Sequence, residues 1–375
     1  MKINYLIVGA GLSASIIAER IANILKKEVL VIDRRNHIGG NIYDYKDKNN
    51  IIIHKYGPHA FHTDNKKVWD YLSHFTEWQI YFHKVLAVVD GIKIPLPFNL
   101  NSIYKVFPAN QASKLEKKLI ETFGYNVKIP ILKLKKIKDK DLQFLANYIY
   151  EKVFLGYTIK QWNLKPEELD ESVTSRVPVY ISRDDRYFQD KYQGIPADGY
   201  TKMVENILDN KLIKIELGMD FNKVKNEIKY DYLIYTGSID EFFDYKFGKL
   251  PYRSLEFKIE TFKKEYFQEV AQVNYPENYD FTRITEFKHF LSTNLDKTTI
   301  AYEFPQDYKD GKNEPYYPIP NRANETLFQK YRIESKKLQN VIFLGRLAEY
   351  KYYNMDKIVE RALKVFEEDI SKWKK

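Results

Sequence analysis

The sequence predicts an α/β protein in which a parallel sheet is interrupted by a helical and a β-rich insertion. Three observations predict it. The chain starts as strand–helix–strand, with an apolar strand at 4–8, helical spacing over 12–25 and a second strand at 29–33. Residues 111–172 then read as mostly helical, and residues 230–305 as short β-rich segments. Because the strand–helix pattern returns near the end, we expect distant parts of the chain to complete one sheet.

The shorter elements follow from local patterns taken in order. Residues 66–76 have helical spacing, and Pro95 and Pro97 interrupt the chain before the helical insertion, because proline lacks a backbone N–H. Apolar segments bounded by turn residues predict short strands, and the last of them precedes an amphipathic helix. The strands are expected at 231–236, 269–274, 283–287, 298–304 and 340–345, and the helix at 355–370.

Composition excludes several classes of protein. The 375 residues suffice for two or three packed units. The net charge of +9 is spread over residues of both signs, and the basic run 133–140 has no interleaved aromatics, so it reads as a solvated face rather than a nucleic-acid site. The absence of cysteine excludes disulfides, Cys–zinc sites, iron–sulfur clusters and a Cys nucleophile. No apolar run reaches about 18 residues, and the apolar start reads as a buried strand rather than a signal peptide, so we expect a cytoplasmic protein without a membrane span.

A glycine-rich turn joins the first strand to the first helix, in the order Gly9-Ala-Gly11-Leu-Ser13-Ala14. Gly9 allows the tight turn, and Gly11 lets the backbone approach a pyrophosphate at the helix N-terminus. Asp33 ends the second strand, where its carboxylate can accept both ribose hydroxyls of a dinucleotide. Arg34 and Arg35 suggest a reader of a 2′-phosphate instead, but Asp33 would repel that phosphate.

A second glycine pair follows in His37-Ile-Gly39-Gly40-Asn41. It lets more backbone approach the same ligand, which is a feature of FAD-binding Rossmann domains rather than of simple dehydrogenases. Together the two motifs favour FAD as the cofactor.

No metal site and no hydrolase site is expected. His59 and His62 are three residues apart, a spacing that could ligate a metal on a helix. However, Tyr56-Gly57-Pro58 indicates a loop, and no third ligand is evident. No Gly-x-Ser-x-Gly motif supports a serine hydrolase.

Arginine, tyrosine and tryptophan recur in short distinctive segments. A guanidinium matches the oxygens of a diphosphate in bidentate fashion, and aromatic rings with polar tips suit a nucleobase or a sugar face. The alternative is that these residues are surface ion pairs and core aromatics. The segments are Gly156–Trp162, Arg176–Val179, Tyr187–Pro196, Thr282–Glu286, Glu314–Pro318 and Phe343–Tyr353.

In this order, these segments resemble the flavin-dependent UDP-galactopyranose mutase family, which includes dTDP-fucopyranose mutases. The resemblance extends from Gly9 to about Leu363 and includes Tyr56–Thr63 and Arg253-Ser-Leu. It implies an isomerase that interconverts a nucleotide-linked hexopyranose and its hexofuranose without net redox change. Reduced FAD is the nucleophile in this family, with NAD(P)H or another donor as the reductant. The resemblance further implies a homodimer and a product used for bacterial surface polysaccharide, such as the O-antigen of lipopolysaccharide.

The resemblance also implies roles for individual residues. Arg176 and Arg283 match the pair that grips the diphosphate, and His62 matches a histidine beside the flavin; these three are the catalytic candidates. The substrate-binding candidates are His83, Tyr157, Thr158, Trp162, Tyr187, Asn274, Tyr316, Tyr317 and Tyr352. The cofactor-binding candidates are Gly9, Gly11, Ser13, Asp33, Arg34, Gly40, Asn41, His59, Ala60, Asp220, Phe221, Arg346, Asp356 and Lys357.

Four positions depart from the family pattern. His83 stands where the family usually has Asn, Asn354 replaces an Asp, Asn163 replaces a Gly, and Ala60 replaces a larger apolar residue. The changes near the sugar leave open whether the substrate carries galactose or a 6-deoxyhexose such as fucose. Nothing in the sequence separates a uracil from a thymine base.

The expected architecture is discontinuous. A Rossmann-type FAD-binding domain is expected from 1–78, about 190–230 and 319–375, and an antiparallel-sheet domain from about 79–100 and 231–318. A helical domain is expected at about 103–178, and the resemblance implies a mobile loop at 167–180. Two other functions stay open: a flavin amine oxidase-like oxidoreductase, and a non-catalytic binder of nucleotides or nucleic acid.

Overall fold

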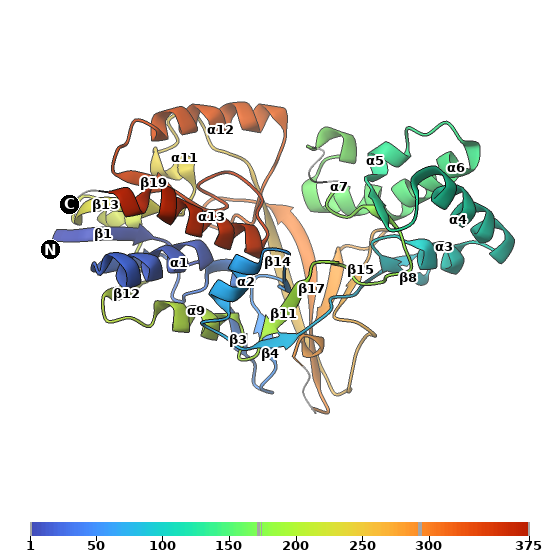
Figure 1. The fold of residues 1–375 in the computed structure, drawn as a ribbon, viewed down its shortest axis with the longest axis horizontal. Coiled ribbons are helices and arrows are strands. Elements are labelled where there is room, and N and C mark those ends of the chain that lie inside the picture. Colours follow the sequence, from blue (N-terminus) through green and yellow to red (C-terminus); the bar gives the residue numbers. More distant parts are fainter. Residues whose placement is uncertain (1, 171–172, 174, 292–294, 374–375) are drawn as a thin grey trace.

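The computed structural model describes residues 2–170, 173, 175–291 and 295–373. The molecule is elongated, with both termini in an α/β unit at one end and a helical unit at the other (Figure 1). An antiparallel sheet lies between these two units. Among the described residues, no helix combines the length and the apolar character needed to cross a bilayer.

Five parallel strands form the sheet of the α/β unit, in the order β12-β2-β1-β13-β19. All five residues of β2 are buried, as expected for a parallel strand covered on both faces. The sheet confirms that distant parts of the chain complete the first strand–helix–strand unit. Its strands are β1 (Lys2–Val8), β2 (Val29–Asp33), β12 (Ile213–Leu217), β13 (Lys229–Tyr235) and β19 (Val341–Phe343).

Helices cover both faces of the parallel sheet. On one face, α1 (Leu12–Arg20), α9 (Tyr200–Leu208) and α13 (Met355–Glu368) pack in the largest apolar core; α1 continues as a π-helical segment, Ile21–Leu25. The other face buries apolar side chains of α10 (Phe221–Val224) and α11 (Ile239–Phe242). The apolar side of α12 (Arg322–Ser335) packs beside α11. The helices expected at 12–25 and 355–370 are therefore present.

The domain boundary expected at 230–231 is wrong. Lys2 pairs with Lys229 and Val8 with Tyr235, so β13 lies inside the parallel sheet. The first antiparallel strand after this point, β14, begins at Tyr252. The apolar pattern of β13 suits either kind of sheet, and only its pairing with β1 decides which one it joins.

The antiparallel sheet has seven strands in the order β18-β14-β17-β16-β15-β7-β8. It draws strands from both expected segments, and β15 pairs in parallel with β7. Across β15 and β16, Asn274 is the register partner of Arg283. The strands are β7 (Val85–Val89), β8 (Ile92–Leu96), β14 (Tyr252–Phe262), β15 (Gln272–Asn274), β16 (Arg283–Glu286), β17 (Thr298–Asp307) and β18 (Tyr317–Pro318).

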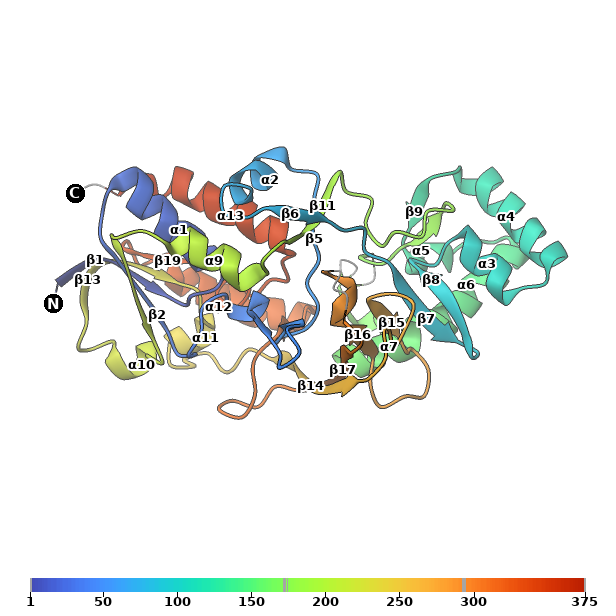
Figure 2. The same cartoon turned by 90° about the horizontal axis from the view of Figure 1, so that it is seen from below.

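The helical unit packs on β7 and β8 of the antiparallel sheet in a separate apolar core at the far end of the molecule (Figure 2). Apolar side chains of the long amphipathic α4 and of α6 meet there, with Leu115, Leu119 and Leu145 each at most 1% exposed. The helices are α3 (Leu100–Val106), α4 (Ala109–Phe123), α5 (Ile131–Leu134), α6 (Lys140–Ile149), a π-helical segment Tyr150–Leu155 and α7 (Gly156–Trp162).

Smaller elements connect the three units. The loop expected at 167–180 is bounded by a 3₁₀ turn, Pro166–Glu168, and by β10; residues 171, 172 and 174 of it lie outside the described residues. The remaining helices are α2 (Lys66–Leu72) and the 3₁₀ turns Gly40–Ile42, Phe287–His289 and Ile370–Lys372. The remaining strands are β3 (Asp44–Lys46), β4 (Ile52–His54), β5 (Phe61–Thr63), β6 (Trp78–Ile80), β9 (Val127–Ile129), β10 (Val179–Ile181) and β11 (Tyr192–Pro196).

Candidate active site

Two glycine turns meet at the carboxyl ends of the parallel strands. Gly9 has a φ of +102°, and a Cβ there would lie 2.0 Å from Thr236 Oγ1. A Cβ on Gly40 would lie 2.9 Å from the Cα of Gly11, so the two turns touch through their backbones. The Gly39 N–H donates to the Ala10 carbonyl at 2.8 Å and joins them. Side chains are excluded here for steric reasons, which leaves backbone free to approach a ligand.

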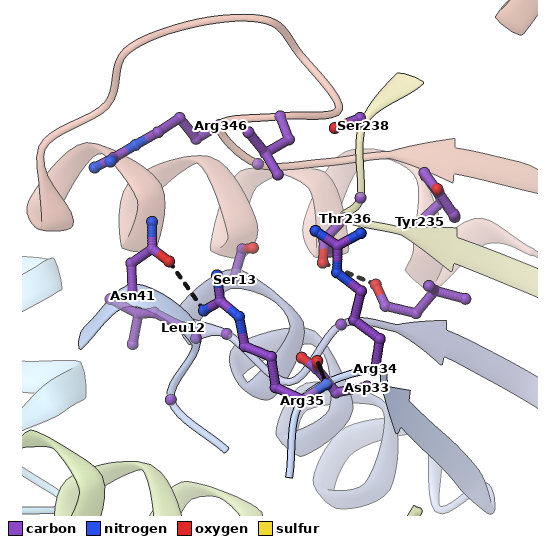
Figure 3. A pocket seen from close by; sticks show the side chains of 18 of the residues that line it. Leu12, Ser13, Asp33, Arg34, Arg35, Asn41, Tyr235, Thr236, Ser238 and Arg346 are labelled. Carbon is purple, nitrogen blue, oxygen red and sulfur yellow. Dashed lines mark hydrogen bonds between the residues drawn. The ribbon is translucent and has the colours of Figure 1, made fainter. Parts of the chain in front are cut away.

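The Asp33 carboxylate organises the same turn. One oxygen accepts from the Ala10 N–H at 2.7 Å and the other from the Arg35 N–H at 2.8 Å. Each carboxylate oxygen has further lone pairs, so ribose hydroxyls can still be accepted. Arg35 also donates to Asn41 Oδ1 at 3.0 Å (Figure 3). The second glycine segment is thereby tied to the end of β2.

Arg34 and Arg35 form ion pairs with glutamate side chains. The Arg35 Nη2 lies 2.6 Å from Glu314 Oε2, and Arg34 lies within 3.8 Å of both Glu241 and Glu314. Their charges are largely balanced by these carboxylates, which leaves little free charge for a 2′-phosphate. This arrangement favours the reading of Asp33 as a partner for ribose hydroxyls.

These turns enclose a cavity of about 220 Å³. Most of the cofactor-binding candidates lie on its wall, at the strand ends and the N-terminus of α1 (Figure 3). The position suits a dinucleotide whose pyrophosphate faces the helix N-terminus. The candidates on the wall are Gly9, Gly11, Ser13, Asp33, Arg34, Gly40, Asn41, His59, Asp220, Phe221 and Arg346.

Three cofactor-binding candidates do not reach this wall. Ala60 packs against the main core, and Asp356 is 6% exposed and accepts from Thr63 Oγ1 at 3.3 Å. Lys357 lines the neighbouring cleft instead. Met355 and Ile358 line the cavity, so the helical period of α13 turns the two residues between them away.

Other wall residues were missed by the sequence reasoning. Thr236, Gly237 and Ser238 follow β13, and Gly345 follows β19. Small residues directly after a parallel strand were the available signal, because ligands of open α/β sheets bind at the carboxyl ends of the strands. The other wall residues that were not named as cofactor-binding candidates are Val8, Leu12, Arg35, Gly39, Ile42, Met219, Asn222, Tyr235, Glu241, Leu347, Tyr353, Met355 and Ile358.

Two residues of the cavity wall, His59 and Asn222, each bury a side-chain polar atom that has no hydrogen-bond partner among the described residues. His59 Nδ1 has no hydrogen-bond partner among the described residues, although His59 lies on the cavity wall. Burial lowers the pKa of His59 to about 3, so the imidazole is neutral at pH 7. A neutral ring nitrogen that lacks a partner is costly to bury, and a polar ligand group could satisfy it.

A second, open cleft of about 1370 Å³ adjoins the first cavity, since Tyr353 lines both. Here the Arg176 guanidinium lies 3.6 Å from the centre of the Tyr352 ring, and its Nη2 donates to Asn354 Oδ1 at 2.8 Å. Arg346 lies 4.8 Å from the same ring. Two arginines thus flank one phenol at the mouth of the cofactor cavity.

Tyr352 also stacks on Tyr317, with ring centres 5.4 Å apart. Trp162 of α7 lies 5.9 Å from Tyr317, so the helical unit and the antiparallel sheet contribute to one aromatic cluster. Tyr316 is buried, and its carbonyl accepts from Arg346 at 3.2 Å. The Tyr316–Tyr317 pair therefore joins the wall of the cofactor cavity to the cleft.

Arg283 enters this cluster from β16. Its Nε and Nη2 lie 2.8 and 2.6 Å from Glu303 Oε2, and the Glu303 side chain is 1% exposed. Burial disfavours the charged guanidinium, but the Glu303 carboxylate outweighs this and raises the pKa of Arg283 well above its usual value. Burial raises the pKa of Tyr157 and of Tyr187. The positive charge of Arg283 opposes this rise at both phenols without cancelling it. The expected diphosphate and nucleotide residues therefore share one electrostatic environment.

The remaining candidates lie on the β7–β15 side. His83 is 5% exposed, and burial lowers its pKa to about 3. The Tyr187 N–H donates to the His83 carbonyl at 2.7 Å, and Gln272 Nε2 donates to Asn274 Oδ1 at 3.0 Å. Thr158 of α7 is likewise buried. These contacts fix the backbone of His83 and the side chain of Asn274, and the His83 ring lies 5.7 Å from the ring of Tyr187.

His62 is the third catalytic candidate. Its ring stacks on Phe188 at 3.5 Å, and its Nδ1 lies 3.1 Å from Asp190 Oδ2. No group of three or more potential metal ligands occurs in the part of the chain that the structure describes. His62 thus stacks on an aromatic ring, and its buried Nδ1 lies close to a carboxylate without a well-aligned hydrogen bond.

Comparison with known proteins identifies the family. The family model described as UDP-galactopyranose mutase matches residues 152–352, and that of an NAD(P)-binding Rossmann-like domain matches residues 7–75. The chain belongs to the UDP-galactopyranose mutase family. It is 38% identical over 373 residues to the Klebsiella pneumoniae protein named "Probable UDP-galactopyranose mutase", covering 98% of this chain and 95% of that protein.

The chain is also similar to a second kind of mutase and to a solved structure. A dTDP-fucopyranose mutase of Escherichia coli is 36% identical over 365 residues, which cover 96% of this chain and 96% of that protein. The crystal structure of a reduced UDP-galactopyranose mutase superimposes with a TM-score of 0.76 at 16% identity, covering 99% of this chain and 94% of the other. The oxidoreductase alternative is less supported, since these relatives are mutases.

Proposed function

We propose that this protein is an FAD-dependent mutase that interconverts a nucleotide-linked hexopyranose and its hexofuranose. The observation that carries the proposal is the junction at Tyr353 between a dinucleotide cavity and a cleft with paired arginines and stacked tyrosines. The glycine cradle, Asp33 and the unpartnered Nδ1 of His59 fit FAD. When bound in its reduced form, FAD supplies the nucleophile for the anomeric carbon.

The chain's own residues then bind substrate and balance charge. Arg176 and Arg283 hold the diphosphate and stabilise its charge as it leaves the sugar. Tyr157 contacts the base, and Tyr352 contacts the diphosphate. His62 lies at the flavin, stacked on Phe188 and close to Asp190. We further propose a cytoplasmic homodimer whose product serves surface-polysaccharide synthesis, by analogy with the family.

The proposed function is tested by giving the purified protein a nucleotide hexopyranose before and after flavin reduction. We expect furanose formation only after reduction by dithionite or NAD(P)H, with no reductant consumed per turnover. Stoichiometric consumption of NAD(P)H or O2 would instead support the oxidoreductase alternative. A protein that purifies without flavin would support the non-catalytic binder.

The identity of the sugar is tested with reduced enzyme and two substrates, UDP-galactopyranose and dTDP-fucopyranose. His83 and Asn354 depart from the family pattern, and Asn354 holds Arg176. If they mark a site adapted to a 6-deoxy sugar, kcat/KM should be higher for dTDP-fucopyranose, because a buried hydroxyl without a partner is rejected.

The matched variants are His83→Asn and Asn354→Asp, separately and together. Under the 6-deoxy hypothesis they should shift the preference toward galactose. Equal or better use of UDP-galactopyranose by the unaltered enzyme would refute the hypothesis. UDP and dTDP as competing inhibitors measure the preference for the base independently.

Tyr352 predicts a pH dependence. Burial alone would raise the pKa of its phenol, but the charges of Arg176 and Arg346 outweigh burial and lower it to about 8. The phenolate therefore forms as the pH rises through 8 and repels a diphosphate. We expect KM for the nucleotide sugar to rise by about tenfold between pH 7 and 9.

The control variants separate this tyrosine from its neighbour. Tyr352→Phe should have a pH-independent KM over this range. Burial raises the pKa of Tyr317, so Tyr317→Phe should keep the rise. If KM still rose with pH in Tyr352→Phe, a group other than Tyr352 would be responsible for the pH dependence.

A further inference from the structure

Lys160 makes contacts that the proposed reaction leaves unexplained. It lies on α7, and its ammonium donates to four backbone carbonyls of the loop 275–281. The acceptors are the carbonyls of alternate residues: Tyr275, Glu277 at 2.9 Å, Tyr279 at 3.2 Å and Phe281 at 3.1 Å. An ammonium has three N–H donors, so four acceptors saturate it.

The loop 275–281 connects two strands of the candidate site. It closes the hairpin of β15 and β16, whose last cross-strand pair is Asn274 and Arg283. The Tyr275 N–H donates to the Thr282 carbonyl at 2.8 Å and closes the loop at its base. Arg283 is the first residue of β16, so the position of this loop affects where its backbone and its guanidinium lie.

The other side of the contact is α7, which carries Tyr157, Thr158 and Trp162. A Cβ on Gly156 would lie 2.3 Å from the Pro276 carbonyl oxygen, so α7 and the loop are in direct backbone contact. The α7 backbone is held from its other end by Arg253, whose Nε donates to the Gln161 carbonyl at 2.9 Å. Two cationic side chains thus fix α7. Arg253 binds a carbonyl near its C-terminal end, and Lys160 of the helix itself binds the hairpin loop.

The carbonyl cluster requires a cation. Four carbonyl oxygens converge on one point, and each carries partial negative charge, so removing the ammonium would leave them mutually repulsive and poorly partnered. Lys160 is half-buried, and burial lowers the pKa of its ammonium to about 8 although the charge of Asp280 opposes this, so the side chain is still mostly protonated at pH 7. An apolar side chain of equal length could pack there but could not satisfy the oxygens.

We propose that Lys160 is a positioning residue that fixes the distance between α7 and the Asn274–Arg283 end of the hairpin. It thereby sets the spacing between the residues for the nucleotide and the residues for the diphosphate. This inference rests on the proposed function for its ligand, a nucleoside diphosphate. Lys160 itself touches neither substrate nor cofactor in this account.

The test compares Lys160→Met with Lys152→Met in the full-length, flavin-loaded protein. Lys152 contacts the same loop through the side chain of Glu277 at 3.2 Å, but not through its carbonyls. Hydrogen exchange of the amides in 275–283 reports the loop, and the Kd of UDP and of dTDP reports the binding site. Both readouts are independent of turnover.

We expect Lys160→Met to exchange these amides about tenfold faster and to bind its nucleotide about tenfold more weakly. Lys152→Met should change either quantity by no more than about twofold, as for an exposed ion pair. Lys160→Arg, which keeps the charge and the donors, should recover most of the affinity. If Lys160→Met does not fold, Lys160→Gln replaces it in the comparison.

Three outcomes each test a different part of the proposal. Unchanged exchange in Lys160→Met would overturn the contact as a determinant of loop position. Faster exchange with unchanged nucleotide affinity would overturn the positioning role. Failure of the unaltered protein to bind either UDP or dTDP would refute the proposed function, while the exchange data would still decide whether Lys160 holds the loop.

Discussion

Replacing Arg176 by alanine is expected to lower kcat by about 10³-fold while the flavin stays bound and Tm stays unchanged. The guanidinium lies at the exposed rim of the cleft, against Tyr352 and Asn354. Its contacts within the protein are exposed and contribute little to the free energy of unfolding. Its charge is needed where the diphosphate develops charge on leaving the sugar, so the loss should fall on the chemical step.

Two variants sharpen this measurement. Arg176→Lys keeps the charge but loses the planar pair of donors, and it should recover only part of kcat. Arg183→Ala is the matched control, because Arg183 is an exposed arginine seven residues further along the chain that pairs with Glu116 at 2.7 Å and does not line the cleft. Near-normal turnover of Arg176→Ala by reduced enzyme would remove this residue from the reaction.

Arg283→Ala is expected to lose both turnover and stability. Glu303 is 1% exposed, and Arg283 is its ion-pair partner at 2.6 Å. Removing one partner of a buried pair leaves an uncompensated charge, which costs about 3–5 kcal/mol of unfolding free energy. The loss of charge stabilisation should lower kcat by about 10³-fold, as for Arg176.

The double variant Arg283→Ala with Glu303→Gln separates these two effects. Neutralising Glu303 removes the uncompensated charge, so the unfolding free energy from urea titration should return toward that of the unaltered protein. Turnover should stay low, because the cation for the diphosphate is still missing. Recovery of turnover together with stability would mean that Arg283 acts only through folding.

Local sequence determined the cofactor-binding half of the site. The turn from Gly9 to Gly11, the acid at the end of β2 and the second glycine pair are each defined within a few residues. They depend on a strand, a tight turn and a helix N-terminus, all of which have short-range sequence signals. The structure accordingly brings most of these residues to one cavity wall.

The arginine and tyrosine segments were recognised from the sequence, but their geometry was not. From the sequence, Asn354 was identified only as a departure from the family pattern and Glu303 was not identified, although these two residues hold Arg176 and Arg283. Asn354 lies 178 residues from Arg176, and Glu303 faces Arg283 only because β16 pairs with β17 in this register. Contacts of that range leave no periodic pattern, so the pairing could not be read beforehand.

The tertiary structure alone decided which sheet β13 joins, which residues complete the cofactor cavity and what Lys160 binds. Residues 231–236 are apolar enough for either sheet, and pairing with β1 places them in the parallel one. Thr236 and Gly345 reach the cavity only because β13 pairs with β1 and β19 pairs with β13, so that these parallel strands end at one edge of the sheet. A sequence encodes local turns and burial through neighbouring residues, whereas strand order and the convergence of carbonyls on one ammonium depend on how distant segments pack.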